Sequence, residues 1–206
     1  MVDSSAEGEM SLYKVRAGFY RKIVERYSDA VNAGEEKTIP DLKNLVNPDD
    51  ATVQGLRKEI EGGIQTGEYR FEKDFASYAE KAFNKVQSLL RIHSELSVSF
   101  WLYPSDILEL GAADAFDRSI LLCSLLIAGG CRNAKIRVLE VEGGARHPVV
   151  VYTFNERQHF LDPTQESSAT TFTGSLEEIF SQYSYEGKKV TKSAFEFNNE
   201  EYNEFD

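Results

Sequence analysis

Apolar residues recur every three or four positions in two long stretches of the first half of the chain. One stretch runs from Leu12 to Val31, before a stop at Gly34. The other runs from about Arg70 to Ile92. This period matches the turn of an α-helix, so the pattern predicts a long helix in each stretch.

The segment between these helices, residues 35–66, is polar, and its helical patterning is weak. Pro40, Pro48 and the pair Gly62-Gly63 interrupt it. We therefore expect a connection that holds only short helical pieces, around the runs DLKNLV and ATVQGLRKEIE.

The second half opens with the run SVSFWLYPSDILELG, in which an aromatic stretch ends at Pro104. A short helix up to Gly111 is expected to follow. A buried helix is predicted from Asp114 to about Ala128, because the residues in between are largely apolar and the pair Gly129-Gly130 closes the run.

Beyond this helix the hydrophobic period changes to two residues. The runs KIRVLEVE, HPVVVYTF and QHFLD are predicted as three strands of an antiparallel meander, with a turn at Gly143-Gly144. Ser175 and Glu178 have the spacing of a capping box that opens a further helix, and VTKSAFEF could add a final strand. The predicted fold class is α+β, a helix packed on an antiparallel sheet and preceded by long helices.

This order divides the chain into three parts. We expect an N-terminal helical segment over residues 1–69 and a core domain over 70–197. The last part, 198–206, is expected to be an acidic tail or an exposed edge, because the chain has five acids and no base after Lys192.

Composition and charge limit the classes of partner. With 41% hydrophobic and 12% aromatic residues, the chain has the composition of a globular protein with a real core. Its formal net charge is −11, so its surface repels phosphate backbones and anionic lipid head groups. Nucleic acid and membranes are therefore not expected as partners.

The two cysteines, Cys123 and Cys131, lie inside and just after the predicted apolar helix. They are expected to be reduced thiols, and they lack the spacing of metal ligands. No glycine-rich phosphate loop or dinucleotide motif is present, so no cofactor is expected; acidity alone would allow calcium, but solvation explains it equally well. The start MVDSSAEGEM has no signal-peptide pattern, and no apolar run is long enough to cross a bilayer, so a cytoplasmic protein is expected.

The run GAADAFDRSILLC places Ala115 in the first turn of the predicted buried helix. Asp114 is a good N-cap, and Asp117 follows three residues later. Unpaired backbone N–H groups and the helix dipole stabilise negative charge in a first turn. A cysteine there would have a lowered pKa and would be a competent nucleophile, yet an alanine is present.

Such a nucleophile needs a histidine base and a third group that orients the histidine. If Asn155-Glu156 form a two-residue hairpin loop, the strand register places Asp162 opposite Val149. Val149 shares a strand face with His147, so a hydrogen bond between His147 and Asp162 is within reach. The alternative is a strand-end histidine and an Asp162 that only caps the turn before Pro163.

Other residues with suitable chemistry fit the pattern less well. Cys123 and Cys131 are far from the helix start, and nothing marks Ser119 as activated. His93 is expected at the surface and His159 on a strand face.

The runs FWLYPSDILELGAADAFDRSILLCSLLIAGG, RHPVV and FLDPT follow one another in an order that resembles the transglutaminase-like superfamily of cysteine acyltransferases and hydrolases. The resemblance covers roughly residues 70–165. It implies a papain-like core, in which a helix carrying the nucleophile packs on an antiparallel sheet carrying the histidine and the aspartate.

Carried over residue by residue, the resemblance implies that His147 is the general base and Asp162 the orienting acid. Asp114 and Asp117 match the two acids that flank the cysteine of the family. Trp101 matches an aromatic residue upstream of the nucleophile, although core packing is its expected role.

Three positions depart from the family pattern. Ala115 falls on the nucleophile position, Ala113 stands where glycine is usual, and Pro148-Val149 replaces a pair that ends in tryptophan. A methyl group cannot attack a carbonyl, so covalent catalysis by this route is impossible with this sequence. The several departures favour natural loss of the nucleophile, whereas the retained His147 and Asp162 favour an engineered replacement.

Three hypotheses of function follow. In the first, the chain is a transglutaminase-like pseudoenzyme that binds a peptide or protein in the former active-site groove. In the second, it is a cysteine acyltransferase or peptidase-like hydrolase whose nucleophile has been replaced by Ala115. In the third, the helices before residue 92 form an interaction surface and the remainder is scaffold.

Overall fold

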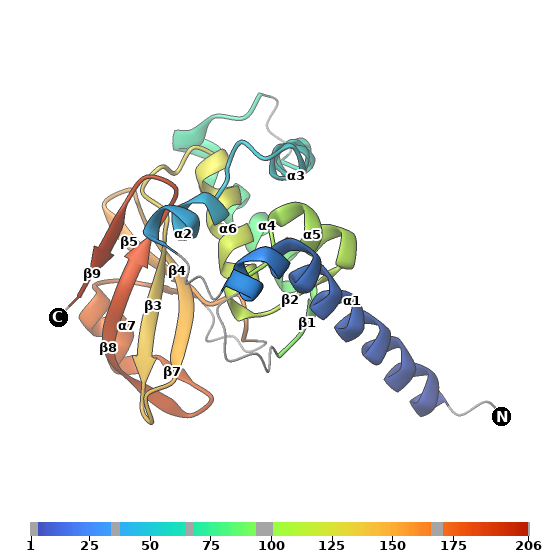
Figure 1. Ribbon diagram of the computed structural model, residues 1–206. Helices are drawn as coiled ribbons and strands as arrows, with labels where there is room; N and C mark the ends of the chain where they lie inside the picture. Colours follow the sequence, from blue (N-terminus) through green and yellow to red (C-terminus); the bar gives the residue numbers. More distant parts are fainter. Residues whose placement is uncertain (1–3, 34–37, 65–67, 94–100, 166–170, 206) are drawn as a thin grey trace.

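The structure is a computed structural model that describes residues 4–33, 38–64, 68–93, 101–165 and 171–205 (Figure 1). The helices are α1 (Ser4–Ala33), α2 (Ile39–Leu45), α3 (Ala51–Gly62), α4 (Phe71–Gln87), α5 (Pro104–Leu110), α6 (Ala115–Ala128) and α7 (Leu176–Gln182). The strands are β1 (Leu90–Arg91), β2 (Ala112–Ala113), β3 (Lys135–Val141), β4 (Arg146–Phe154), β5 (Arg157–Leu161), β6 (Thr171–Thr173), β7 (Ser184–Tyr185), β8 (Lys188–Phe197) and β9 (Tyr202–Glu204).

One antiparallel sheet organises the second half of the chain. Its strand order is β6-β5-β4-β3-β8-β7, and β9 pairs with β8. The strands that carry the predicted meander, β3, β4 and β5, are consecutive neighbours in this order. Figure 1 shows the sheet on one side of the molecule and helices α3 to α6 beside it.

Helix α6 is the centre of the core. Most of its residues are buried, and it contacts α3 and α4 as well as strands β3 and β4. An almost wholly apolar helix is stable only where other elements cover it on all sides, so α6 lies between the helical layer and the sheet. A smaller cluster on the sheet joins Leu139, Val149 and Phe160 to Ile179 of α7.

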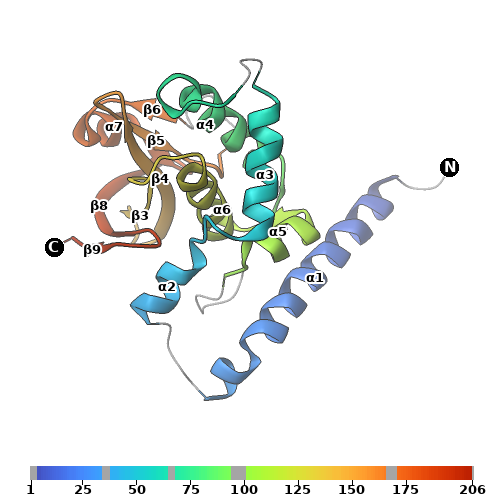
Figure 2. The same ribbon diagram turned by 90° about the horizontal axis from the view of Figure 1, so that it is seen from above.

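Helix α1 contacts the body through α5. Phe19 and Ile23 are buried there, and Lys22 and Arg26 form ion pairs with Asp106. Figures 1 and 2 show that the N-terminal part of α1 extends away from the rest of the molecule. Within the described residues, no helix is long and apolar enough to cross a membrane.

Two segments differ from the sequence-based expectations. The helix expected up to Ile92 ends at Gln87, because Leu90 and Ile92 donate backbone hydrogen bonds to Gly111 and Ala113 and so pair with β2 instead. The last residues, expected as a tail or an edge, form the edge strand β9 on β8. The side chain of Asn198 accepts two backbone hydrogen bonds in the preceding turn, which reverses the chain.

Candidate active site

The start of α6 is capped as the sequence predicts. The carboxylate of Asp114 accepts a hydrogen bond from the backbone N–H of Asp117, and the Asp117 carboxylate accepts one from the backbone N–H of Asp114. Ala115 is the first residue of the helix and is half-buried. Its methyl group therefore occupies a helix N-terminus that is partly open to solvent.

His147 and Asp162 are hydrogen-bonded to each other. The register of β4 and β5 pairs Phe154 with Arg157 and Val150 with Leu161, as a two-residue loop requires. Both loop residues, Asn155 and Glu156, have positive φ, the conformation of a type I′ hairpin turn. His147 Nε2 lies 3.0 Å from Asp162 Oδ2, and both side chains are buried.

Asp162 is held by a dense set of donors. Besides His147, the backbone N–H and the hydroxyl of Thr164 donate to Oδ1, at 2.9 and 2.7 Å. The hydroxyl of Tyr183 and the amide of Gln165 donate to Oδ2, at 2.6 and 2.8 Å. Burial alone would raise the pKa of Asp162, but the hydrogen bond and charge of His147, with Tyr183 and Thr164, hold that pKa well below its ordinary value. The carboxylate is therefore fixed in its charged form.

The ring of His147 is fixed from a second direction. Tyr185 stacks on it, with the ring centroids 3.6 Å apart and the planes inclined by 17°. The hydroxyl of Tyr185 accepts a hydrogen bond of 3.0 Å from Arg91, which also donates to the backbone carbonyl of Thr164. Asp162 engages Nε2, so Nδ1 is the ring nitrogen that a nucleophile could use.

Two buried side chains of α6, Ser119 and Arg118, contact the backbone next to His147 and Asp162. Ser119 donates to the carbonyl of Ala115 and also lies 3.4 Å from the carbonyl of Pro148, the residue after His147. Arg118 donates to the carbonyl of Pro163, the residue after Asp162, at 2.8 Å. These contacts bring the first turns of α6 to the end of the sheet where His147 and Asp162 lie.

Burial raises the pKa of the Asp114 carboxyl group. Removal from water raises the pKa of its carboxyl group to about 6, although the backbone N–H groups of Asp117 and Phe116 favour the charged form. Asp117 is also buried and accepts a 2.7 Å hydrogen bond from the backbone N–H of Leu102. The two acids therefore cap the helix and anchor the segment before it.

The remaining predicted residues also have defined places. Trp101 is buried and stacks on Phe116 of the first turn of α6, with the ring centroids 4.6 Å apart. Ala113 is buried in β2, where its carbonyl accepts a hydrogen bond from Ile92. The catalytic roles that the resemblance implies for these residues and for His147 and Asp162 stay predictions.

The other side chains with suitable chemistry, which fit the sequence pattern less well, lie outside this site or are unsuited to react. Cys123 and Cys131 are buried, and burial raises the pKa of both thiols. His159 stacks on Tyr152 instead of joining His147. Ser119 is fully buried. Among the residues that the structure describes, no group of three or more histidine, cysteine or acidic side chains is arranged to hold a metal ion.

Sequence reasoning missed the supporting residues of the pair, Arg118, Thr164, Gln165, Tyr183 and Tyr185. Arg118 carried a usable signal, because a charged residue inside an otherwise apolar helix must find a buried partner. The two tyrosines gave none, since both reach the pair from the segment that follows α7, and its place beside His147 and Asp162 depends on tertiary packing.

The comparisons with known proteins bear on the fold. No family model matches the chain, and no curated protein matches it in sequence. Legionella pneumophila LapG matches in structure with a TM-score of 0.52 and 13% identity, over 74% of this chain and 85% of that chain. EGTA-treated LapG of the same organism gives a TM-score of 0.52 and 13% identity, over 74% and 83% of the two chains.

A TGase structure also matches, at 12% identity, over 80% of this chain and 44% of that chain. Its TM-score of 0.39 is too low to support an argument. At such identities a likeness concerns the fold and not the activity. The architecture confirms the predicted α+β fold class: like LapG in fold, the chain has N-terminal helices that precede a helix packed on a curled antiparallel sheet.

Proposed function

We propose that this chain is a transglutaminase-like pseudoenzyme that binds a peptide or protein segment beside His147 without converting it. One observation carries the proposal: the buried His147–Asp162 pair lies at the end of the sheet that meets the start of α6, where Ala115 stands. In this proposal the pair is the remainder of a cysteine triad, and the nucleophile position, Ala115, cannot form a covalent bond.

The physical chemistry of the pair supports a functional rather than a purely structural role. A buried carboxylate with this many donors is costly to assemble, and a well-packed apolar pair would stabilise the fold as well or better. An oriented imidazole beside a helix N-terminus can hydrogen-bond to the carbonyl or amide of a bound polypeptide. Binding is therefore the function that this set of groups can still perform.

The alternative proposal is a cysteine acyltransferase or peptidase-like hydrolase in which Ala115 replaces the nucleophile. The same pair favours it, because a single side chain would complete a set of nucleophile, base and orienting acid. Sequencing codon 115 of the source gene separates the two: an alanine codon supports the pseudoenzyme, and a cysteine codon supports the enzyme.

Binding itself is tested by nuclear magnetic resonance of the three histidines during titration with a panel of synthetic peptides. We expect at least one peptide to shift the imidazole signals of His147 and to leave those of His93 and His159 unchanged. The mass of that peptide should not change, because the chain neither cleaves nor modifies it. The variant Ala115→Trp should abolish the shift, whereas Ser77→Trp, on the exposed face of α4, should not. A panel that leaves His147 unperturbed, or a peptide that the unmodified chain cleaves or modifies, would overturn the proposal.

A further inference from the structure

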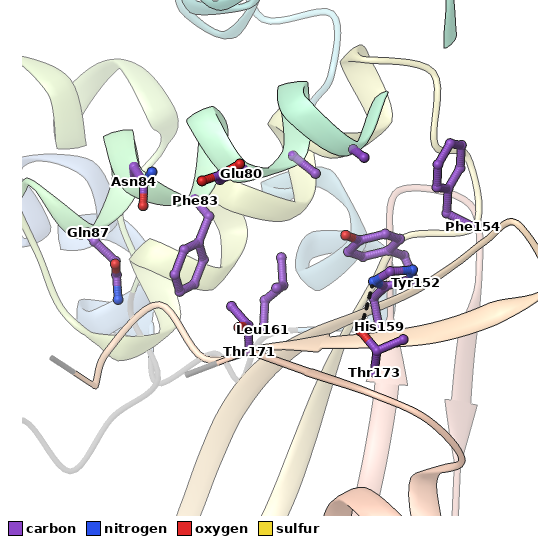
Figure 3. Close-up of a pocket in the computed structure, with 12 residues that line it drawn as sticks. Glu80, Phe83, Asn84, Gln87, Tyr152, Phe154, His159, Leu161, Thr171 and Thr173 are labelled. Atoms are coloured by element: carbon purple, nitrogen blue, oxygen red, sulfur yellow. Dashed lines mark hydrogen bonds between the residues drawn. The ribbon is translucent and has the colours of Figure 1, made fainter. Parts of the chain in front are cut away.

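A hollow of about 500 Å³ lies apart from the His147–Asp162 pair, between α4 and strands β4, β5 and β6 (Figure 3). Pockets of about 300 to 1,000 Å³ are typical for small-molecule ligands. One flank of α4 forms its upper wall, and Leu161 and Thr171 lie beneath. The small side chains of Ala76 and Ala79 leave the space open under the helix.

The side walls of the hollow are aromatic. Tyr152 and His159 stack almost in parallel, with centroids 4.7 Å apart and planes inclined by 2°. Figure 3 shows this pair on one side of the hollow and the ring of Phe83 on the other. The hydroxyl oxygen of Thr173 lies 3.4 Å from His159 Nδ1, and this hydrogen bond orients the imidazole. A flat ring between these walls would gain stacking and edge contacts with each of them.

The polar residues at the rim of the hollow include an acid but no base among the described residues. Glu80, Asn84 and Gln87 line the hollow from α4, and neither lysine nor arginine is among the described residues that line it. Burial lowers the pKa of His159 and so favours the neutral form of its ring. Glu80 therefore gives the rim a negative charge, in a chain whose formal net charge is −11.

We propose that this hollow is a binding site for a flat aromatic molecule that carries a protonated amine. The ring lies between Phe83 and the Tyr152–His159 pair, and the ammonium group points to Glu80. The amide oxygens of Asn84 and Gln87 are further acceptors, while the Gln87 amide N–H donates to the carbonyl of Gln165. The same charge disfavours ligands that carry a carboxylate or a phosphate. The inference is independent of the proposed function, because no residue that lines the hollow belongs to the His147–Asp162 pair or its donors.

The test uses three probes with one ring and different charge: tryptamine, indole and indole-3-propionate. Binding to the full chain is measured by calorimetry and by the imidazole signals of His159. We expect tryptamine to bind about three- to tenfold more tightly than indole-3-propionate, with indole between them, since an exposed carboxylate gives a modest charge effect. The variant Glu80→Gln should remove most of this difference and leave the binding of indole unchanged.

Placement of the ligand is tested with two variants of α4. Ala76→Trp fills the hollow from its rim and should abolish binding of all three probes, whereas Ser77→Trp adds the same side chain at a neighbouring exposed position outside the hollow. Equal affinity for the three probes, absence of binding, or equal binding by both tryptophan variants would each overturn the proposal.

Discussion

Asp162 shows how one residue can be both an electrostatic cost and an anchor. A buried carboxylate is unstable unless several donors replace the water that it loses. Here His147, Thr164, Gln165 and Tyr183 supply those donors, and the pKa of Asp162 lies below its ordinary value as a result. The residue therefore stabilises the fold only as long as it is charged.

Substitution of Asp162 by alanine should lower the free energy of unfolding by about 3 to 5 kcal/mol, because the variant leaves several buried donors without a partner. Urea denaturation at pH 7 measures this loss. The exposed Glu177→Ala serves as a control and should change stability by less than about 0.5 kcal/mol. A loss below about 1 kcal/mol for Asp162→Ala would mean that the network contributes little.

The direction of the pH effect follows from the same carboxylate. The pKa of Asp162 is lowered in the folded protein. Its contribution to the free energy of unfolding is therefore complete above about pH 3.9, the ordinary carboxyl value, and is lost progressively as the pH falls below 3.9 toward the folded pKa. Acid should therefore destabilise the native chain more than the variant Asp162→Asn, in which this position no longer titrates. An equal loss of stability in both proteins between pH 6 and pH 3 would contradict this account.

At the scale of an element, the N-cap of α6 combines a good hydrogen-bonding cap with the burial of an ionisable group, Asp114. Asp114 forms the reciprocal cap with Asp117, yet burial raises the pKa of Asp114 to about 6. The ionised form is thus less stable in the folded protein than in the unfolded one. A folded pKa above the unfolded value contributes stability at low pH that is lost as the pH rises through about 6.

The variant Asp114→Asn should gain stability relative to the native chain as the pH rises from 4 to 7. Asparagine caps a helix as well as aspartate does but cannot ionise. The shift in pKa corresponds to a relative gain of about 2 to 3 kcal/mol. Parallel urea titrations at pH 4 and pH 7 measure it, and a difference between the two proteins that does not change with pH would be the contrary result.

Elements with a strong local signal could be predicted from the sequence. The period of apolar residues located α1, α4, α6 and the meander, and the Asn155-Glu156 turn fixed the register that joins His147 to Asp162. Local patterns could not predict β1 or β9, because both depend on pairing with a distant segment. The same limit applies to Tyr185, whose stacking on His147 brings together residues that are far apart in the sequence.

At the scale of the whole molecule, the close approach of α4 and α6 joins the helical layer to the sheet. Tyr78 of α4 donates a hydrogen bond to the carbonyl of Leu125 in α6, and its ring lies against Gly129 at the end of that helix. A side chain at position 129 would collide with the Tyr78 ring, although the backbone conformation there suits any residue.

The substitution Gly129→Ala should therefore lower the free energy of unfolding by about 1 to 3 kcal/mol, as overpacked cores do. Gly55 is the matched control, because it lies inside α3 with no atom near the position of an added methyl group. Gly55→Ala should raise stability by about 0.5 to 1 kcal/mol. Thermal unfolding of both variants measures the contrast, and a neutral Gly129→Ala would show that the two helices can separate freely.

The central claim is that the buried His147–Asp162 pair can still activate a thiol at position 115. The alkylation rate of Ala115→Cys as a function of pH tests this claim most directly. The unmodified chain supplies the background, since Cys123 and Cys131 are buried. The account predicts a thiolate that forms well below the ordinary cysteine pKa of about 8.5 and loses this property when His147→Ala is added. A thiol that titrates near 8.5 with or without His147 would contradict it.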